Sequence, residues 1–309
     1  ALFVKGTPAM IPKLTIDAHP PLEMAERMED VGVSKATMDL QSMFFLAVLA
    51  GSFIGLGAEF FTVVTTSSGL AFGMNKLIGG LVFSLGLILV VIAGAELFTG
   101  NNLIVMAWVG GKLTLAQVMR NWIVVYLGNL VGSVAIVLFM YFTDQWAFAD
   151  YRVGATALNI ANAKVNLSFT TALTRGILCN ALVCLAVWLT LSGRSVTDKI
   201  LAILFPITAF VASGFEHSIA NMYFIPMGLL MKGEPQVLEA AGVITADLAA
   251  LNMQGFLDNL LVVTTGNIFG GGFLVALVYW FIYRRPQVRL TAESGQDQAR
   301  SLATDQASG

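Results

Sequence analysis

The chain has 309 residues, of which 57% are hydrophobic and only 12% are charged, and its mean hydropathy is +0.78. Seventeen basic and nineteen acidic side chains are too few to solvate a 33.0 kDa soluble globule, since about 25% of the residues of such a domain are charged. The low charged fraction and the high hydropathy therefore indicate an integral membrane protein. A net charge of −2 also disfavours nucleic acid as a partner.

The segment before residue 42 is predicted to lie outside the bilayer, in the cytoplasm. Residues 1–20 contain three prolines and no helical period, which predicts an extended arm. Residues 22–37 combine apolar side chains at helical spacing with interspersed charges. This pattern predicts a short amphipathic helix at the membrane surface.

Six nearly uncharged stretches follow, each long enough to cross about 30 Å of hydrocarbon. They comprise residues 42–64, 77–111, 121–143, 169–191, 200–231 and 259–283. We predict helices, because a lone strand cannot satisfy its backbone in lipid. The tail from 284 to 309 is polar and is predicted to be disordered and cytoplasmic.

Basic residues are distributed unequally between the two sides of this six-span arrangement. Six spans place both termini on one side, which receives twelve of the Lys and Arg side chains, while the other side receives five. Cytoplasmic loops carry an excess of Lys and Arg. We therefore expect both termini in the cytoplasm.

The second and fifth stretches are too long for one crossing, and each is interrupted at the same motif. The pattern G-x-E-x-x-x-x-N occurs twice, 120 residues apart, with its fixed positions at Gly94, Glu96 and Asn101 and at Gly214, Glu216 and Asn221. A second echo, G-N-x-x-G, begins at Gly128 in the third stretch and at Gly266 in the sixth. The preserved order predicts two repeats of three spans, about 42–143 and 169–283.

Three spans reverse the direction of the chain, so the second repeat is expected to insert upside down. We predict that spans two and five are each a half-helix, a loop and a half-helix, broken at the membrane midplane. Asn101 and Asn221 stand where the second half-helices begin, and Asn is a strong N-cap. The positive dipole ends of these half-helices would then point towards the membrane centre, which suits an anion.

Glu96 and Glu216 are the costliest residues in the predicted spans, because a carboxylate in the membrane must be stabilised. We favour a scaffold role, in which they accept amide hydrogens freed at the breaks, over a role in transport. His217 lies in the second break, where a structural and a working histidine are equally consistent with the sequence. Thr99 offers a hydroxyl at the matching break. Lys164 is interpreted as solvated surface, with an anion-attracting vestibule as the alternative.

Three segments of the chain resemble signatures of the formate/nitrite transporter family. They are VIAGAELFTG at 91–100, GILCNALVCLA at 176–186 and SGFEHSIAN at 213–221. The resemblance runs from about residue 22 to residue 283. It implies an all-α, aquaporin-like protomer with two inverted three-helix repeats, assembled as a homopentamer with a pore in each protomer.

The resemblance also implies that small monovalent anions or their conjugate acids pass, without a cofactor or a metal. By motif, His217, Thr99 and Asn180 would be the polar residues of a central chamber, and Lys164 a vestibule residue. The implied constrictions are Leu87, Leu97 and Phe98 on the cytoplasmic side and Phe83 and Phe210 on the periplasmic side. The helix at 22–37 would be the pH-responsive N-terminal helix of the family.

The substrate and the rival functions stay open at this point. The stretch from 214 to 227 resembles formate channels, whereas the run from 97 to 102 is closer to nitrite or hydrosulfide members, and we favour formate. A water or glycerol channel would need paired Asn-Pro-Ala motifs, and an ammonium channel would need twin pore histidines; the sequence has neither. The sequence contains neither an H-E-x-x-H motif nor a nucleophile elbow, so nothing in it favours an enzyme.

Overall fold

The computed structural model describes residues 18–287, and in this part of the chain every regular element is helical. The long helices are α2 (Leu40–Thr65), α3 (Phe72–Ala93), α5 (Leu115–Phe142), α7 (Phe169–Ser192), α8 (Val196–Ala212) and α11 (Met253–Ile268). α11 continues as two π-helical segments, Phe269–Leu277 and Trp280–Arg284. The remaining helices are α1 (Pro21–Thr37), α4 (Val105–Val109), α6 (Arg152–Val165), α9 (Ser218–Met231) and α10 (Pro235–Ala241).

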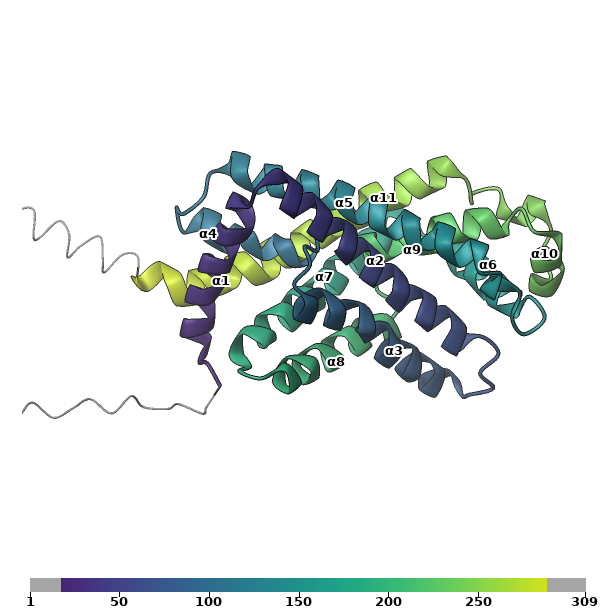
Figure 1. The fold of residues 1–309 in the computed structure, drawn as a ribbon, viewed down its shortest axis with the longest axis horizontal. Helices are drawn as coiled ribbons and strands as arrows, with labels where there is room; N and C mark the ends of the chain where they lie inside the picture. The colour runs from purple at the N-terminus through teal and green to yellow at the C-terminus, as the bar shows by residue number, and fades with distance from the viewer. Residues whose placement is uncertain (1–17, 288–309) are drawn as a thin grey trace, which may run out of the picture.

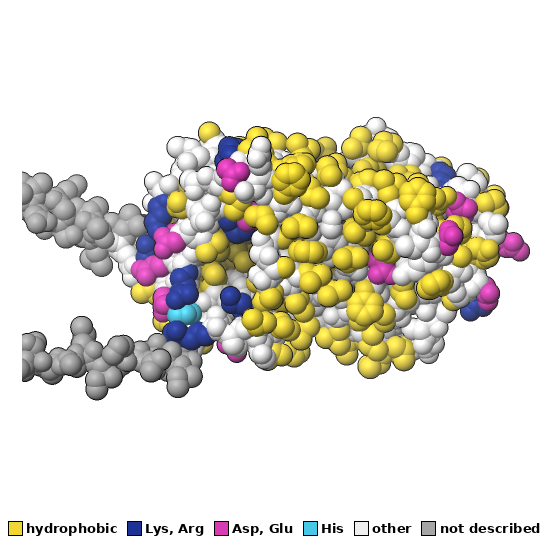
Figure 2. Space-filling model, viewed as in Figure 1, with side chains coloured by type: hydrophobic (Ala, Val, Ile, Leu, Met, Phe, Trp, Pro, Cys, Tyr) yellow, Lys and Arg dark blue, Asp and Glu magenta, His cyan; other side chains and the backbone are white. Residues whose placement is uncertain are grey.

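Within the described residues, five helical stretches are individually long and apolar enough to cross a membrane. The fifth predicted span is instead shared by α8 and α9, which brings the number of crossings to six. Two of the six are broken: the second, between α3 and the short helices from Gly100 to Val109, and the fifth, between α8 and α9. The long helices lie roughly along the long axis of the molecule (Figure 1). On the face drawn in Figure 2, apolar side chains cover the middle and charged ones gather towards the two ends. This is the distribution expected of a protein surrounded by lipid.

The short helices that flank the two repeats lie at opposite ends of the molecule. α1 and α4 lie at the end where the described chain begins and ends, whereas α6 and α10 lie at the other end (Figure 1). α5 crosses close over α2 because Gly132 has no side chain. A Cβ at this position would stand only 1.9 Å from the Val48 carbonyl oxygen. The same holds for the last span over α7, where a Cβ on Gly270 would stand 2.1 Å from the Ile177 oxygen.

Ion pairs fasten the amphipathic helix α1 to the membrane domain. Glu29 is only 1% exposed, and Arg284 and Lys112 each donate to its carboxylate at 3.0 Å. Arg284 also lies 2.7 Å from Glu26. α1 is therefore part of the packed structure and not only a helix resting on a lipid surface.

Two expectations about elements need correction. The tail does not begin at residue 284, because the last helix runs to residue 287 and Arg284 is held by α1. α6 was not predicted, since its 14 residues are too few and too polar to form a membrane span. The predicted extended arm and the polar tail otherwise fall on residues 1–17 and 288–309, outside the described residues.

Candidate functional site

The two long spans break where a glycine adopts the left-handed conformation. α3 ends at Ala93, and Gly94 follows it with φ 81°. α8 ends at Ala212, and Gly214, two residues later, has φ 69°. Helical structure resumes at Gly100 in the first break and at Ser218 in the second. A side chain at these φ values is strained, so glycine fits both turns.

Two buried asparagines satisfy the backbone that the breaks expose. Asn129 accepts from the Phe98 amide at 2.9 Å and donates to the Glu96 carbonyl at 2.9 Å. Asn267 accepts from the Ser218 amide at 2.9 Å and donates to the Glu216 carbonyl at 3.0 Å. An unpaired backbone group in a membrane costs several kcal/mol, so these side chains make the non-helical loops tolerable.

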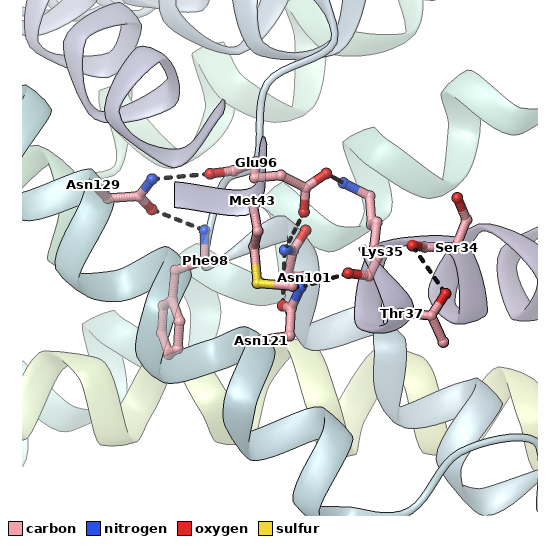
Figure 3. Close-up of polar contacts among 9 residues, drawn as sticks. All are labelled: Ser34, Lys35, Thr37, Met43, Glu96, Phe98, Asn101, Asn121 and Asn129. Carbon is pink, nitrogen blue, oxygen red and sulfur yellow. Dashed lines mark hydrogen bonds and ion pairs between the residues drawn. The ribbon is translucent and has the colours of Figure 1, made fainter. Parts of the chain in front are cut away.

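The glutamates of the repeated motif each form an ion pair with a lysine. Glu96 accepts from Lys35 of α1 at 2.6 Å and from Asn101 at 2.7 Å (Figure 3). Glu216 accepts from Lys164 of α6 at 3.0 and 3.1 Å and from Asn221 at 2.8 Å. Both carboxylates are buried, at 4% exposed, and each is neutralised by its lysine.

These contacts correct two predictions about the motif. Asn101 and Asn221 are not N-caps, since Thr99 and His217 hold those positions and the asparagines bind the glutamates instead. The carboxylates of Glu96 and Glu216 bind lysine and asparagine side chains, whereas the expected partners were amides of the broken backbone. An amide side chain can donate and accept at once, which makes Asn129 and Asn267 better suited to a broken backbone than a carboxylate.

A further asparagine closes each network in the same way. Asn121 accepts from Asn101 at 3.0 Å and donates to the Lys35 carbonyl at 3.1 Å (Figure 3). Asn259 accepts from Asn221 at 2.8 Å and donates to the Lys164 carbonyl at 2.9 Å. The first half of the chain therefore repeats in the second half, contact by contact, and the amphipathic helices α1 and α6 belong to the repeat.

His217 and Thr99 meet between the two breaks. The His217 Nε2 atom lies 2.9 Å from the Thr99 hydroxyl, and its Nδ1 accepts from the Ala220 amide at 3.0 Å. A backbone amide can only donate, so Nδ1 carries no hydrogen and the proton of the neutral ring is on Nε2. Nε2 therefore donates to Thr99. No acceptor for the threonine hydroxyl hydrogen is present among the described residues.

Two cavities lie on either side of this pair. The α6-side cavity, of about 190 Å³, is lined by His217 and Glu216 together with Phe83, Phe210, Lys76, Lys164 and Arg175. The α1-side cavity, of about 280 Å³, is lined by residues that include Lys35, Leu87, Glu96, Leu97, Gly100 and Lys199. The rings of Phe83 and Phe210 stand edge to face at 5.6 Å, which narrows the α6-side cavity next to the histidine.

The structure brings most of the pore candidates to these cavities, but Thr99, Phe98 and Asn180 line neither of them. Phe98 lines neither of the two, because its ring packs against Trp122 and Tyr126 of α5. Asn180 is fully buried behind Thr99 and donates to its carbonyl at 3.2 Å. Lys164 is not solvated surface, since its side chain is 14% exposed and paired with Glu216.

Sequence reasoning missed several residues that build the site. They are Lys35, Asn121, Asn129, Arg175, Asn259 and Asn267. The G-N-x-x-G echo contained Asn129 and Asn267, but only its glycines were interpreted. Lys35 and Lys164 carry no local signal, because the lysines lie 61 and 52 residues before their glutamates.

The described residues contain no cluster of His, Cys, Asp and Glu that could hold a metal ion. Cys179 and Cys184 are both free and buried. Cys184 donates to the Thr99 carbonyl at 3.3 Å. The chemistry that the site offers is hydrogen bonding and charge, supplied by His217, Thr99 and the basic side chains.

Comparisons of sequence and of fold with known proteins both find formate/nitrite transporters and formate channels. The family profile described as "Formate/nitrite transporter" matches residues 22–281. The formate channel FocA of Escherichia coli K12 is 46% identical over 269 residues, which cover 86% of this chain and 94% of that protein. A probable formate transporter of Methanothermobacter thermautotrophicus is 38% identical, covering 85% of this chain and 96% of its own.

Two solved structures are similar over almost their whole length. A pentameric formate channel with formate bound superposes with a TM-score of 0.74 at 46% identity, covering 79% of this chain and 97% of that one. An FNT family ion channel gives a TM-score of 0.72 at 29% identity, covering 84% and 98%. The predicted fold class, with six crossings and two broken helices, is confirmed.

Proposed function

Because the chain belongs to the formate/nitrite transporter family, we propose that it is a channel that carries formate, or formic acid, in both directions across the bacterial inner membrane. The protomers assemble as a homopentamer with one pore in each. The observation that carries this proposal is the neutral His217–Thr99 pair, which separates two cavities that basic side chains enter.

The lysine–glutamate pairs explain how a channel for anions can contain buried carboxylates. A bare carboxylate beside the path would repel formate, but Lys35 and Lys164 neutralise Glu96 and Glu216 at contact distance. The glutamates thus serve as scaffold for the breaks. The remaining cations of each cavity attract the anion.

The central pair acts as a hydrogen-bond donor to the permeating species. An anion that leaves water for a narrow apolar passage loses its solvation, which is costly unless donors replace the water. Nε2 of His217 donates to Thr99, which leaves the threonine hydroxyl hydrogen to the substrate. Formic acid carries no charge and crosses Phe83 and Phe210 at a lower cost, so we expect flux to depend on pH.

The topology follows the charge distribution. We place α1 and the residues before it on the cytoplasmic side and both termini in the cytoplasm, and the helices from α2 to residue 287 form the channel domain. The α1-side cavity then opens to the cytoplasm and the α6-side cavity to the periplasm. The protein is a transporter and not an enzyme, and it works without a cofactor.

A substrate panel in proteoliposomes tests the proposal. Purified protein is reconstituted, and uptake of formate, nitrite, hydrosulfide, lactate and water is compared with that of protein-free vesicles. We expect formate to be transported fastest. A preference for nitrite or hydrosulfide would assign the chain to another branch of the same family, and transport of water alone would contradict an anion channel.

A further inference from the structure

We propose that Arg175, assisted by Lys76, is the capture site for small carboxylates at the mouth of the α6-side cavity. Both side chains line this cavity together with Glu216 and His217. The inference rests on the proposed function, because it names the residues that bring the anion to the central pair. It moves the task of attracting the anion away from Lys164, the vestibule residue that the family resemblance implies.

The internal repeat shows that the scaffold does not need a cation at this position. The carbonyl of Arg175 accepts from the amide of Glu216 at 3.3 Å, at the second break. In the first break, the carbonyl of Leu46 accepts from the amide of Glu96 at 3.2 Å. The same backbone contact is thus made with a leucine in one half and an arginine in the other. The guanidinium is an addition that the α6-side cavity has and the α1-side cavity lacks.

Three cations line the α6-side cavity, and two of them, Arg175 and Lys76, are not neutralised by a carboxylate of the described residues. Its third cation, Lys164, is bound to both oxygens of Glu216 and cannot attract a second anion at full strength. No carboxylate pairs with Arg175 or Lys76 within residues 18–287. Lys76 lies over the Phe72 ring, 5.7 Å from its centroid, a contact that does not neutralise its ammonium charge.

The geometry of the guanidinium fits a carboxylate. Its planar fork of N–H donors can bind both oxygens of a carboxylate at once, which a single ammonium cannot do. Arg175 is partly exposed, so an arriving anion can reach it from solvent, and the cavity of about 190 Å³ limits the ligand to small acids. Beyond the guanidinium, the same cavity leads to Phe83, Phe210 and His217.

Cysteine chemistry gives a direct test, because the native cysteines Cys179 and Cys184 are both buried. Arg175→Cys protein in proteoliposomes is treated on both sides with a methanethiosulfonate reagent carrying an ammonium or a sulfonate group. We expect the ammonium reagent to restore formate uptake at low concentration and the sulfonate reagent to reduce it further. Arg152→Cys, at an exposed residue that does not line the cavity, is the matched control and should respond to neither.

Equal responses of the Arg175→Cys and Arg152→Cys proteins, or no response to either reagent, would overturn the proposal. Arg175→Leu, which copies Leu46 of the first break, is expected to fold and to raise the half-saturating formate concentration about fivefold at low ionic strength. Arg175→Lys should recover part of this loss, and salt should shrink the difference from the native protein. Unchanged half-saturation in Arg175→Leu would also refute it. Absence of formate uptake by the native protein would instead refute the proposed function.

Discussion

The ion pair at the second break permits a quantitative prediction. In Glu216→Gln, the carboxylate that now accepts from Lys164 at 3.0 and 3.1 Å is replaced by an amide, while the bond from Asn221 can persist. Removing one partner of a buried pair costs about 3–5 kcal/mol, and Lys164 is 14% exposed, so we take the lower limit, about 3 kcal/mol. Residues 18–287 unfold with an entropy of about 0.6 kcal/mol/K at about 2.1 cal/mol/K per residue. The midpoint should therefore fall by about 5 °C.

The assay is thermal unfolding of the purified protein in detergent, followed by intrinsic fluorescence. The double variant Lys164→Met/Glu216→Gln removes the stranded cation and should recover most of the lost midpoint, because apolar replacement of a buried pair is often nearly neutral. Glu96→Gln should shift the midpoint in the same direction but less, since Lys35 is more exposed, at 24%. A midpoint lowered equally in the single and double variants would show that the charge pair does not stabilise the break.

The other predictions concern the break, the helix crossings and α1. Asn267→Ala leaves the Ser218 amide and the Glu216 carbonyl without their partner, so it should lower the unfolding midpoint by several degrees, and a shift below about 1 °C would contradict the role of Asn267. Gly132→Ala and Gly270→Ala force a Cβ to about 2 Å from a carbonyl oxygen and should abolish the yield of folded protein, whereas Gly73→Ala, with nothing within 4 Å, should be neutral. The hydrogen bond from His19, and then the charges of His19 and Arg27, lower the pKa of Glu23 below 4.5. The stabilisation of α1 by Glu23 is thus complete above pH 4.5 and is lost as the pH falls through the lowered pKa; hydrogen exchange should show the first turn of α1 opening at acid pH in the native protein, and Glu23→Gln should remove this pH dependence.

The broken helices could be predicted from the sequence because the evidence for them is local. A glycine, a costly glutamate and an asparagine recur at one spacing, 120 residues apart, inside apolar stretches too long for one crossing. The start of each break then follows from the glycine, the residue that tolerates a positive φ. The apolar lengths set the ends of the remaining spans to within six residues, the largest differences being the starts of α5 and α11.

The partners of the motif could not be predicted in this way, because the two halves space them differently. Asn121 follows Asn101 by 20 residues, whereas Asn259 follows Asn221 by 38. The connections between spans differ in length, so one alignment offset cannot match all three spans. An ion pair such as Lys35 with Glu96 depends on how α1 packs, which no short pattern encodes.

The direction in which each side chain points from its helix or loop could not be predicted from the sequence either. Phe98 and Thr99 are neighbours in the first break, yet Phe98 turns towards Trp122 and Tyr126 of α5, while Thr99 meets His217. Asn180 lies on α7, where it supports Thr99 from behind. Only the packing of the half-helices decides which of these residues face the cavities.

The role of the His217–Thr99 pair is tested by the pH dependence of formate flux in proteoliposomes that contain either the native protein or His217→Phe. The aromatic replacement keeps a ring beside Phe210, with which His217 stacks at 5.9 Å, but it removes the donor to Thr99 and the acceptor for the Ala220 amide. We predict that formate flux in the variant loses the pH profile of the native protein. An unchanged rate and pH profile would contradict a central role for the His217–Thr99 pair in permeation.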